Sequence, residues 1–128
     1  MQQEGILKSI LIVEDSATTR ALIRAVIEDM GDFNIVEAVS GFEALKLLPT
    51  QEFNLVITDI NMPDINGLEL ISLIKNNPRY SNIPLIIVST ERSEEDKKRG
   101  MALGAMAYIT KPFKANELQE VIKQAINV

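Results

Sequence analysis

The sequence contains neither cysteine nor histidine among its 128 residues. Without cysteine it can form no disulfide, no thiolate metal site and no cysteine nucleophile. Without histidine it lacks the usual general base, the commonest transition-metal ligand and any phosphohistidine of its own. Chemistry must therefore come from carboxylates, hydroxyls, lysine and backbone groups, and a bound metal should be a hard cation held by oxygen.

Long apolar runs are also missing, and none approaches the length of a membrane span. The first nine residues, MQQEGILKS, hold neither a basic segment nor a sustained apolar one, so we predict no signal peptide. We expect a cytoplasmic protein without membrane insertion. An apolar fraction of 46% and a charged fraction of 24% are ordinary for a globular chain, and the length suits one domain.

The net charge of −5 argues against nucleic acid as a partner. The charge is unevenly spread, because residues 1–90 sum to −6 and residues 91–128 to +1. The acidic excess therefore belongs to the first part of the chain, and the last third is slightly basic.

Short apolar runs alternate with helical patterns along the whole chain. After a polar tail of eight residues, we predict strands at 9–13, 34–39, 54–58, 85–88 and 107–109. Strands that alternate with helices form a parallel sheet with helices on both faces. The prediction is an α/β fold, a doubly wound sheet of five strands with five helices, in a single domain 1–128 whose core covers about 8–127.

The helices are predicted from apolar stripes and from capping signals. Two capping boxes, at 40–43 and 93–96, open the second and fourth helices. The fourth helix has almost no apolar stripe, and Gly100 weakens it, so we expect it to be thinly attached. The other four stripes are expected to face inward: Leu22, Ile23, Val26, Ile27 and Met30; Ala44, Leu45 and Leu48; Leu70, Ile71 and Ile74; Leu118, Val121, Ile122 and Ala125.

Polar side chains follow four of the predicted strands at their carboxyl ends, which share one edge of a parallel sheet. Each has an ordinary structural explanation: a helix cap for Asp15 or Ser16, a turn for Asp59, a cap for Ser89 or Thr90, and a solvated charge for Lys111. Their convergence from distant segments favours a site. The groups at this edge are Glu14-Asp15, Asp59, Ser89-Thr90 and Lys111.

Three clustered carboxylates need a compensating cation. Two carboxylates about 5 Å apart repel by roughly 3 kcal/mol at an effective dielectric of 20. Lys111 can offset one charge and a divalent ion the rest, and oxygen ligands in a partly open shell favour Mg²⁺. A magnesium ion, a lysine, a hydroxyl and a spare carboxylate suit phosphoryl transfer, with Asp59 as the nucleophile.

Two other classes of protein remain open at this point. A magnesium-dependent phosphatase of the aspartyl-phosphate type would use a D-x-D pattern after the first strand, where Glu14-Asp15-Ser16 stands. A nucleotide- or flavin-binding module would have a glycine-rich loop there, and residues 14–20 read EDSATTR instead.

Four segments resemble the response-regulator receiver domain of two-component signalling. The segments, in order, are ILIVEDS at 10–16, LVITDINMPDINGLEL at 55–70, PLIIVST at 84–90 and GAMAYITKPF at 104–113. The resemblance spans about residues 8–127 and is nearest to the single-domain chemotaxis regulators. It implies a flavodoxin-like fold with strand order 2-1-3-4-5.

The resemblance also implies a role for each residue at the edge of the sheet. Asp59 would accept a phosphoryl group from a histidine kinase, and Lys111 would contact the phosphoryl oxygens. Glu14, Asp15, Asp59 and the backbone carbonyl of Asn61 would hold Mg²⁺, Ser89 would be the switch hydroxyl, and Tyr108 would change rotamer with it. Glu14 and Ser89 stand where aspartate and threonine are also common, and either choice keeps the needed group.

The same resemblance sets the expected mode of signalling. The chain would catalyse only its own phosphorylation and dephosphorylation, and it would act as a monomer. With no output domain after residue 128, a target protein would dock on the face of the fourth helix, fifth strand and fifth helix. Asn61 and Glu91 would border the attacking water and are not cationic, which favours rapid loss of phosphate and chemotaxis over a phosphorelay role.

Overall fold

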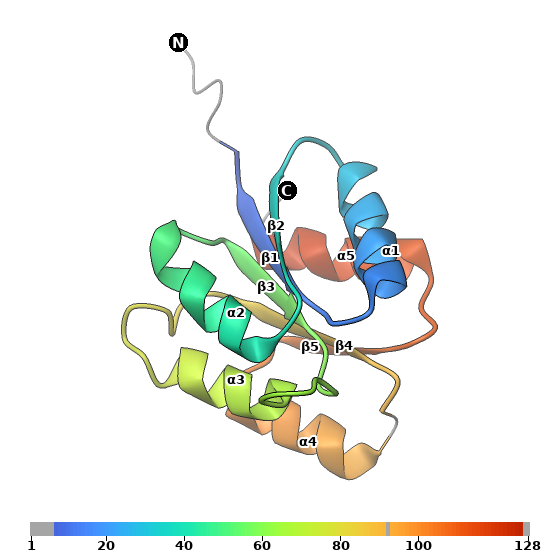
Figure 1. Cartoon of the computed structure of the whole chain (residues 1–128). Coiled ribbons are helices and arrows are strands. Elements are labelled where there is room, and N and C mark those ends of the chain that lie inside the picture. Colours follow the sequence, from blue (N-terminus) through green and yellow to red (C-terminus); the bar gives the residue numbers. More distant parts are fainter. Residues whose placement is uncertain (1–6, 92, 127–128) are drawn as a thin grey trace.

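The computed structural model describes residues 7–91 and 93–126. Within these residues the chain forms one sheet of five parallel strands, in the order β2-β1-β3-β4-β5 (Figure 1). The strands are β1 (Ser9–Val13), β2 (Asn34–Ala38), β3 (Leu55–Thr58), β4 (Leu85–Ser89) and β5 (Ala107–Thr110). The predicted fold class and strand order are confirmed. Most of the predicted polar tail, residues 1–6, lies outside the described residues, as does residue 127 of the predicted core.

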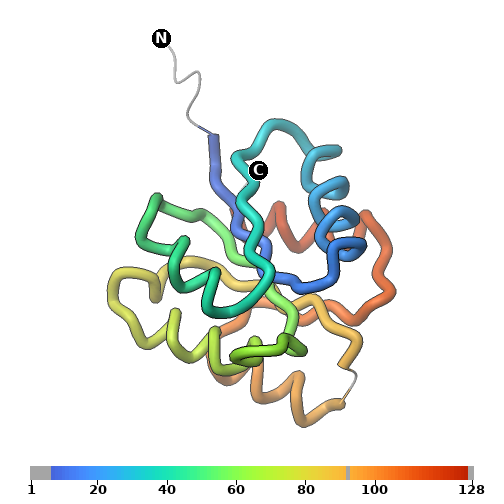
Figure 2. Tube along the Cα trace, in the orientation of Figure 1, coloured from blue at the N-terminus to red at the C-terminus, as the bar shows by residue number. Residues whose placement is uncertain are grey.

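Five α-helices and one short 3₁₀ helix connect the strands. They are α1 (Ala17–Glu28), α2 (Gly41–Leu47), η1 (Leu48–Thr50), α3 (Gly67–Lys75), α4 (Glu94–Leu103) and α5 (Ala115–Ile126). The helices α1 and α5 cover one face of the sheet, and α2, α3 and α4 cover the other (Figures 1 and 2). Every strand therefore ends at the same edge, where the loops leading into the helices begin.

The two faces of the sheet contribute to two separate hydrophobic clusters. Along β1, Ile10 and Ile12 pack towards α1 and α5, whereas Leu11 and Val13 pack towards the other three helices. All five residues of β1 are buried, as a strand covered on both faces requires. All four residues of β3 are buried as well, so the acidic residues that follow β1 and β3 extend from fully packed strands.

The predicted stripe of the first helix is wrong at one position. Ile23, Val26 and Ile27 are buried, but the Leu22 side chain is 52% exposed. Successive residues of a helix are about 100° apart, so the stripe that begins at Ile23 turns Leu22 away from the sheet. The boundaries of β2, β3, β4 and β5 differ from the predicted strands by one residue each.

The thin attachment predicted for the fourth helix is confirmed. Gly100 is the only buried residue described in α4, and Met101 is 45% exposed. A Cβ added at Gly100 would lie 2.6 Å from Cδ1 of Ile87. Gly100 thus does more than weaken the helix, because its lack of a side chain lets α4 approach β4 closely. No helix among the described residues is long and apolar enough to cross a membrane.

Candidate functional site

Three carboxylates meet at the carboxyl edge of the sheet. Glu14 follows β1 and Asp59 follows β3, and their side chains are only 2% and 6% exposed. Asp15 is exposed beside them. One carboxylate oxygen from each of the three lies within 4.8 Å of the others. The adjacency of β1 and β3 brings together acids that are 45 residues apart in the chain.

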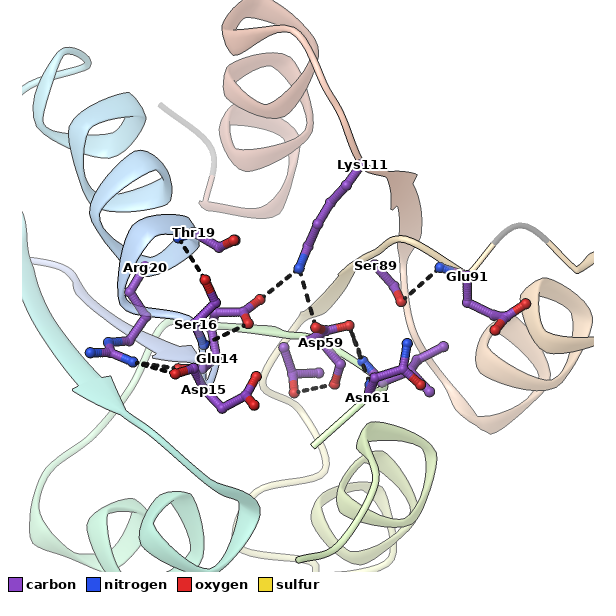
Figure 3. Close-up of polar contacts among 12 residues, drawn as sticks. Glu14, Asp15, Ser16, Thr19, Arg20, Asp59, Asn61, Ser89, Glu91 and Lys111 are labelled. Carbon is purple, nitrogen blue, oxygen red and sulfur yellow. Dashed lines mark hydrogen bonds and ion pairs between the residues drawn. The ribbon is translucent and has the colours of Figure 1, made fainter. Parts of the chain in front are cut away.

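Lys111 reaches this pocket from the loop after β5. Its Nζ donates a hydrogen bond to Glu14 Oε1 at 2.8 Å and to Asp59 Oδ2 at 3.2 Å (Figure 3). The lysine side chain is only 14% exposed. The solvated surface charge that one would expect of an isolated lysine is therefore not what the structure contains.

Burial and charge shift the protonation of this pair. Desolvation raises the pKa of Glu14, and the nearby charge of Asp59 acts in the same direction, although the hydrogen bond from Lys111 opposes both. Burial on its own lowers the pKa of Lys111, but the hydrogen bond that Lys111 donates to Glu14 and the charge of Asp59 outweigh it and raise that pKa. The pocket thus holds more negative charge than one ammonium group neutralises.

Asp59 uses its two carboxylate oxygens differently. Oδ1 accepts from the backbone N–H of Ile60 at 2.6 Å and of Asn61 at 3.3 Å, which is the turn expected of an isolated aspartate. Oδ2 lies beside Lys111. Behind this turn, a Cβ at Gly67 would lie 2.0 Å from the carbonyl oxygen of Asp59, so glycine allows α3 to begin directly against it.

Ser89, Glu91 and Tyr108 form a second group next to the acids. The fully buried hydroxyl of Ser89 accepts from the Glu91 N–H at 3.1 Å, and the Tyr108 hydroxyl donates to the Glu91 carbonyl at 2.8 Å. Ser89 lies between Asp59 and Glu91 in Figure 3. Desolvation raises the pKa of Tyr108. The group links the end of β4 to β5 through the segment that leads into α4.

Two further connections at this edge were not predicted from the sequence. Arg20 in α1 donates to the backbone carbonyls of Glu14 and Asp15, at 2.9 and 3.2 Å. Asp64 accepts from the N–H groups of Gly41 and Phe42, at 3.2 and 2.8 Å, and so ties the loop after β3 to the start of α2. Because these partners are far apart in sequence or are backbone groups, no local pattern indicates them.

The serine caps are present, but among the described residues neither predicted box has the return bond to the N–H of its serine; the Ser93 N–H donates to Glu91 Oε1 at 3.4 Å. The Ser16, Ser40 and Ser93 hydroxyls each accept from the N–H three residues on. In the predicted box at 40–43, the Glu43 carboxylate accepts from the N–H of Val39 instead of that of Ser40. Asn66 also caps α3 through the N–H of Glu69, a cap that the sequence reading missed.

Comparison with known proteins identifies the class to which this fold and site belong. Residues 10–123 match the response regulator receiver domain, and the chain belongs to that family. It is similar to a chemotaxis protein CheY homolog of Campylobacter jejuni, with 35% identity over 118 residues that cover 91% of each chain.

Solved structures show the same likeness. The structure of the chemotaxis protein CheY4 of Vibrio cholerae matches with a TM-score of 0.86 and 29% identity, covering 94% of this chain and 99% of that one. The Mn²⁺-bound form of the response regulator Rcp1 matches with a TM-score of 0.78 and 28% identity, covering 91% of this chain and 90% of that one. The chain is therefore a receiver domain of a response regulator, a signalling protein that works with a histidine kinase and downstream targets.

The acidic pocket fits a divalent cation. Its donors are carboxylate oxygens, the ligands that hard cations prefer, and they lie close enough to share one ion. The three carboxylates outnumber the Lys111 ammonium group beside them, and burial raises the pKa of Glu14. A bound cation would offset the remaining negative charge.

Proposed function

We propose that the chain is a phosphorylation-activated response regulator that accepts a phosphoryl group on Asp59 from a histidine kinase. The observation that supports this most directly is the state of the Asp59 carboxylate. One oxygen is held by two backbone N–H groups, and the other lies 3.2 Å from Lys111 at the end of the central strand. A carboxylate fixed in this way is oriented for attack on phosphorus, which needs positioning more than acid–base chemistry.

In the proposed transfer, an Asp59 oxygen forms a bond to phosphorus as the bond from phosphorus to the kinase imidazole nitrogen breaks. The electron pair of that bond stays on the imidazole. Lys111 now contacts the carboxylates of Glu14 and Asp59. During the transfer it moves partly away from them and offsets the charge on the phosphoryl oxygens. The backbone N–H groups of Ile60 and Asn61 keep the aspartate from rotating during the reaction.

The proposed cofactor is Mg²⁺, held by the carboxylates of Glu14, Asp15 and Asp59 and by the backbone carbonyl of Asn61. When bound, the ion would neutralise negative charge on the carboxylates and on the incoming phosphoryl group. The hard oxygen donors of the pocket support this assignment, as does the Mn²⁺-bound form of Rcp1 among the similar structures. The phosphoryl transfer from the kinase to Asp59 is proposed to take place in the cytoplasm.

The proposed switch consists of Ser89 and Tyr108. The Ser89 hydroxyl now accepts a hydrogen bond from the N–H of Glu91. Phosphorylation would draw this hydroxyl away from Glu91 and towards the phosphoryl oxygens. The bond from Tyr108 to the Glu91 carbonyl depends on the same short segment, so Tyr108 is released to turn inward. The thinly attached α4 would follow, and a target protein would dock on the face of α4, β5 and α5 of the monomer.

Chemotaxis is the role we favour, with a phosphorelay intermediate as the alternative. Asn61 is exposed and Glu91 is half-buried beside the site, and neither is cationic. Such side chains orient a water instead of shielding the aspartyl phosphate, so the phosphorylated form should be short-lived. A short-lived signal suits the control of behaviour, whereas a relay benefits from slow loss. The two chemotaxis proteins among the relatives support the same choice.

The test of the phosphoryl acceptor is Asp59→Asn, with Asp32→Asn as a control at an exposed carboxylate outside the pocket. Each protein is incubated with a small phosphodonor and Mg²⁺, and the intact mass is measured. The parent and the control should each gain one phosphoryl group, and Asp59→Asn should gain none because an amide is not a nucleophile. Labelling of Asp59→Asn at the parent rate would refute the assignment.

The test of the role is the decay of the phosphorylated form without any phosphatase. The parent should lose its label within minutes, and the double variant Asn61→Met, Glu91→Leu should retain it for longer. Persistence of the parent label for hours, or no change in the double variant, would favour the relay.

A further inference from the structure

Arg20 joins three elements at the edge of the sheet. From α1 its Nη1 donates to the carbonyl oxygens of Glu14 and Asp15, which follow β1, and its Nε pairs with Glu37 Oε1 of β2 at 3.0 Å. The side chain is only 17% exposed, despite its position near the start of a surface helix. Figure 3 shows the guanidinium against the backbone of the two acids.

A second arginine of the same helix provides a natural comparison. Arg24 lies one turn later, and its Nε pairs with the other oxygen of Glu37 at 2.6 Å. Arg24 also donates to the carbonyl of Ile35, but it is 35% exposed, and its hydrogen bonds go to Glu37, Glu28 and Ile35. The bonds from Arg24 and then Arg20 lower the pKa of Glu37, so this carboxylate stays ionised and anchors both arginines.

The contacts of Arg20 act on the backbone that holds the acids. Two successive carbonyl groups, those of Glu14 and Asp15, both accept hydrogen bonds from one planar guanidinium. This fixes the orientation of both peptide units, and therefore the direction in which each side chain leaves the backbone. The Asp15 side chain is exposed, so few packing contacts besides these are available to hold it in place.

We infer that Arg20 is a positioning residue for the acidic pocket: it holds the backbone of Glu14 and Asp15 so that their carboxylates bind a divalent cation together. This inference rests on the proposed use of these carboxylates as metal ligands. It assigns Arg20 no contact with the cation itself. Groups that orient metal ligands from behind typically change metal affinity by about 10- to 100-fold when they are removed.

Charge and positioning predict effects of opposite sign. Arg20 and Arg24 each bring one positive charge near the pocket, so removal of either charge alone would make cation binding tighter. Loss of positioning would make it weaker. Of the two arginines, Arg20 is the one that contacts the backbone of Glu14 and Asp15. A weaker affinity confined to Arg20 variants therefore separates the two explanations.

The experiment compares Arg20→Met with Arg24→Met, since each variant loses one ion pair to Glu37. Mn²⁺ alone is titrated into the unphosphorylated protein, and free Mn²⁺ is followed by electron paramagnetic resonance. Arg20→Met should bind Mn²⁺ about tenfold more weakly than the parent, and Arg24→Met equally or more tightly. Parent-like or tighter binding by Arg20→Met, or an equal weakening in Arg24→Met, would overturn the inference.

A second variant keeps the test decisive if Arg20→Met folds poorly. Arg20→Lys retains the positive charge and the aliphatic part of the side chain. A single ammonium group, however, cannot replace a guanidinium that donates to Glu37 and to two carbonyl oxygens at once. Arg20→Lys should also bind Mn²⁺ more weakly, and parent-like affinity would again count against the inference. Urea unfolding without metal reports the stability of each variant.

Phosphorylation provides a readout that a merely structural defect would not share. With a small phosphodonor, the labelling rate of Arg20→Met should approach that of the parent at saturating Mg²⁺, because only cation affinity is impaired. A rate that stays low at saturation contradicts the inference. Failure of the parent to bind any divalent cation would instead overturn the proposed function.

Discussion

Glu14 is the residue whose environment differs most from what a surface carboxylate experiences. It is almost fully buried, and desolvation raises its pKa despite the hydrogen bond from Lys111. A raised pKa in the folded state means that the group favours folding at low pH and that this contribution is lost as the pH rises through the folded pKa. The ionisation of Glu14 therefore makes the metal-free protein less stable at neutral pH than it would be with a carboxyl group of ordinary pKa at this position.

Glu14→Gln should remove this pH dependence. The free energy of unfolding of the metal-free parent should fall, relative to that of Glu14→Gln, as the pH rises from 4.5 towards 7, because only the parent must ionise the buried carboxyl group of Glu14. Urea unfolding at a series of pH values measures the difference. A difference between the two proteins that stays constant over this range would contradict the prediction.

Gly100 shows how a single residue sets the position of an element. Alanine in a helix is intrinsically better than glycine by about 1 kcal/mol. A Cβ at this position, however, would lie 2.6 Å from Cδ1 of Ile87 and force α4 away from the sheet. Gly100→Ala should therefore destabilise the domain by about 1 kcal/mol in net terms, since overpacking typically costs 1 to 3 kcal/mol.

The double variant Gly100→Ala, Ile87→Val tests the cause of this effect. Valine lacks the Cδ1 that obstructs the new methyl group, so the double variant should recover part of the stability lost by Gly100→Ala. Thermal unfolding of the parent, both single variants and the double variant gives the coupling between the two positions. Strict additivity would show that the contact with Ile87 is not the source.

Asp64 links two elements that the sequence gives no reason to connect. Its carboxylate accepts from the first N–H groups of α2, and the bond from Phe42 contributes most to the lowering of its pKa. A lowered pKa means that the contribution to stability is present above pH 3.8, the ordinary pKa, and is lost as the pH falls through the folded pKa.

Asp64→Asn should weaken the link, because an amide is a poorer acceptor at the positive end of a helix. The variant should be less stable than the parent near pH 7, and the two should converge in acid. Urea unfolding at pH 7 and at pH 3 measures both values. Glu120→Gln, a change at an exposed acid in the middle of α5 and away from any helix N-terminus, is the control and should show no such convergence.

At the level of elements, the sequence predicted what local patterns determine. The five strands were found because buried parallel strands are continuous apolar runs, and the serine caps because a serine directly precedes each of α1, α2 and α4. Leu22 was placed wrongly because an apolar residue can adjoin a stripe without belonging to it. The contacts of Arg20 and Asp64 depend on which elements become neighbours, and no periodicity of a single segment reports that.

At the level of the whole molecule, the strand order came from the resemblance to a family and not from the patterns themselves. Alternating strands and helices are compatible with several orders, and only the order with β1 beside β3 brings Glu14 against Asp59. The set of acids at one edge was predictable, because all parallel strands end together. Their burial and the double contact of Lys111 were not, since both depend on side-chain packing.

Cation binding should stabilise the whole domain. A ligand that binds the folded state alone adds free energy of unfolding in proportion to the logarithm of its concentration over Kd, about 1.4 kcal/mol for each tenfold excess. Mg²⁺ should therefore raise the urea midpoint of the parent. Asp15→Ala removes one exposed carboxylate and should abolish the increase with little change in the metal-free midpoint. A magnesium response equal to that of the parent would show that the cation binds elsewhere.

The contact between Lys111 and Glu14 joins residues 97 positions apart, from the end of β1 to the end of β5, with β3 and β4 between them in the sheet. During synthesis on the ribosome, all three acids emerge long before the lysine that offsets their charge. A nascent chain that ends within α4 would contain the acidic pocket without its counter-charge, and mutual repulsion would oppose closure of β1 against β3. Charge balance at the site thus couples the pairing of β1 with β3 to the docking of β5, the strand that brings Lys111 to the acids.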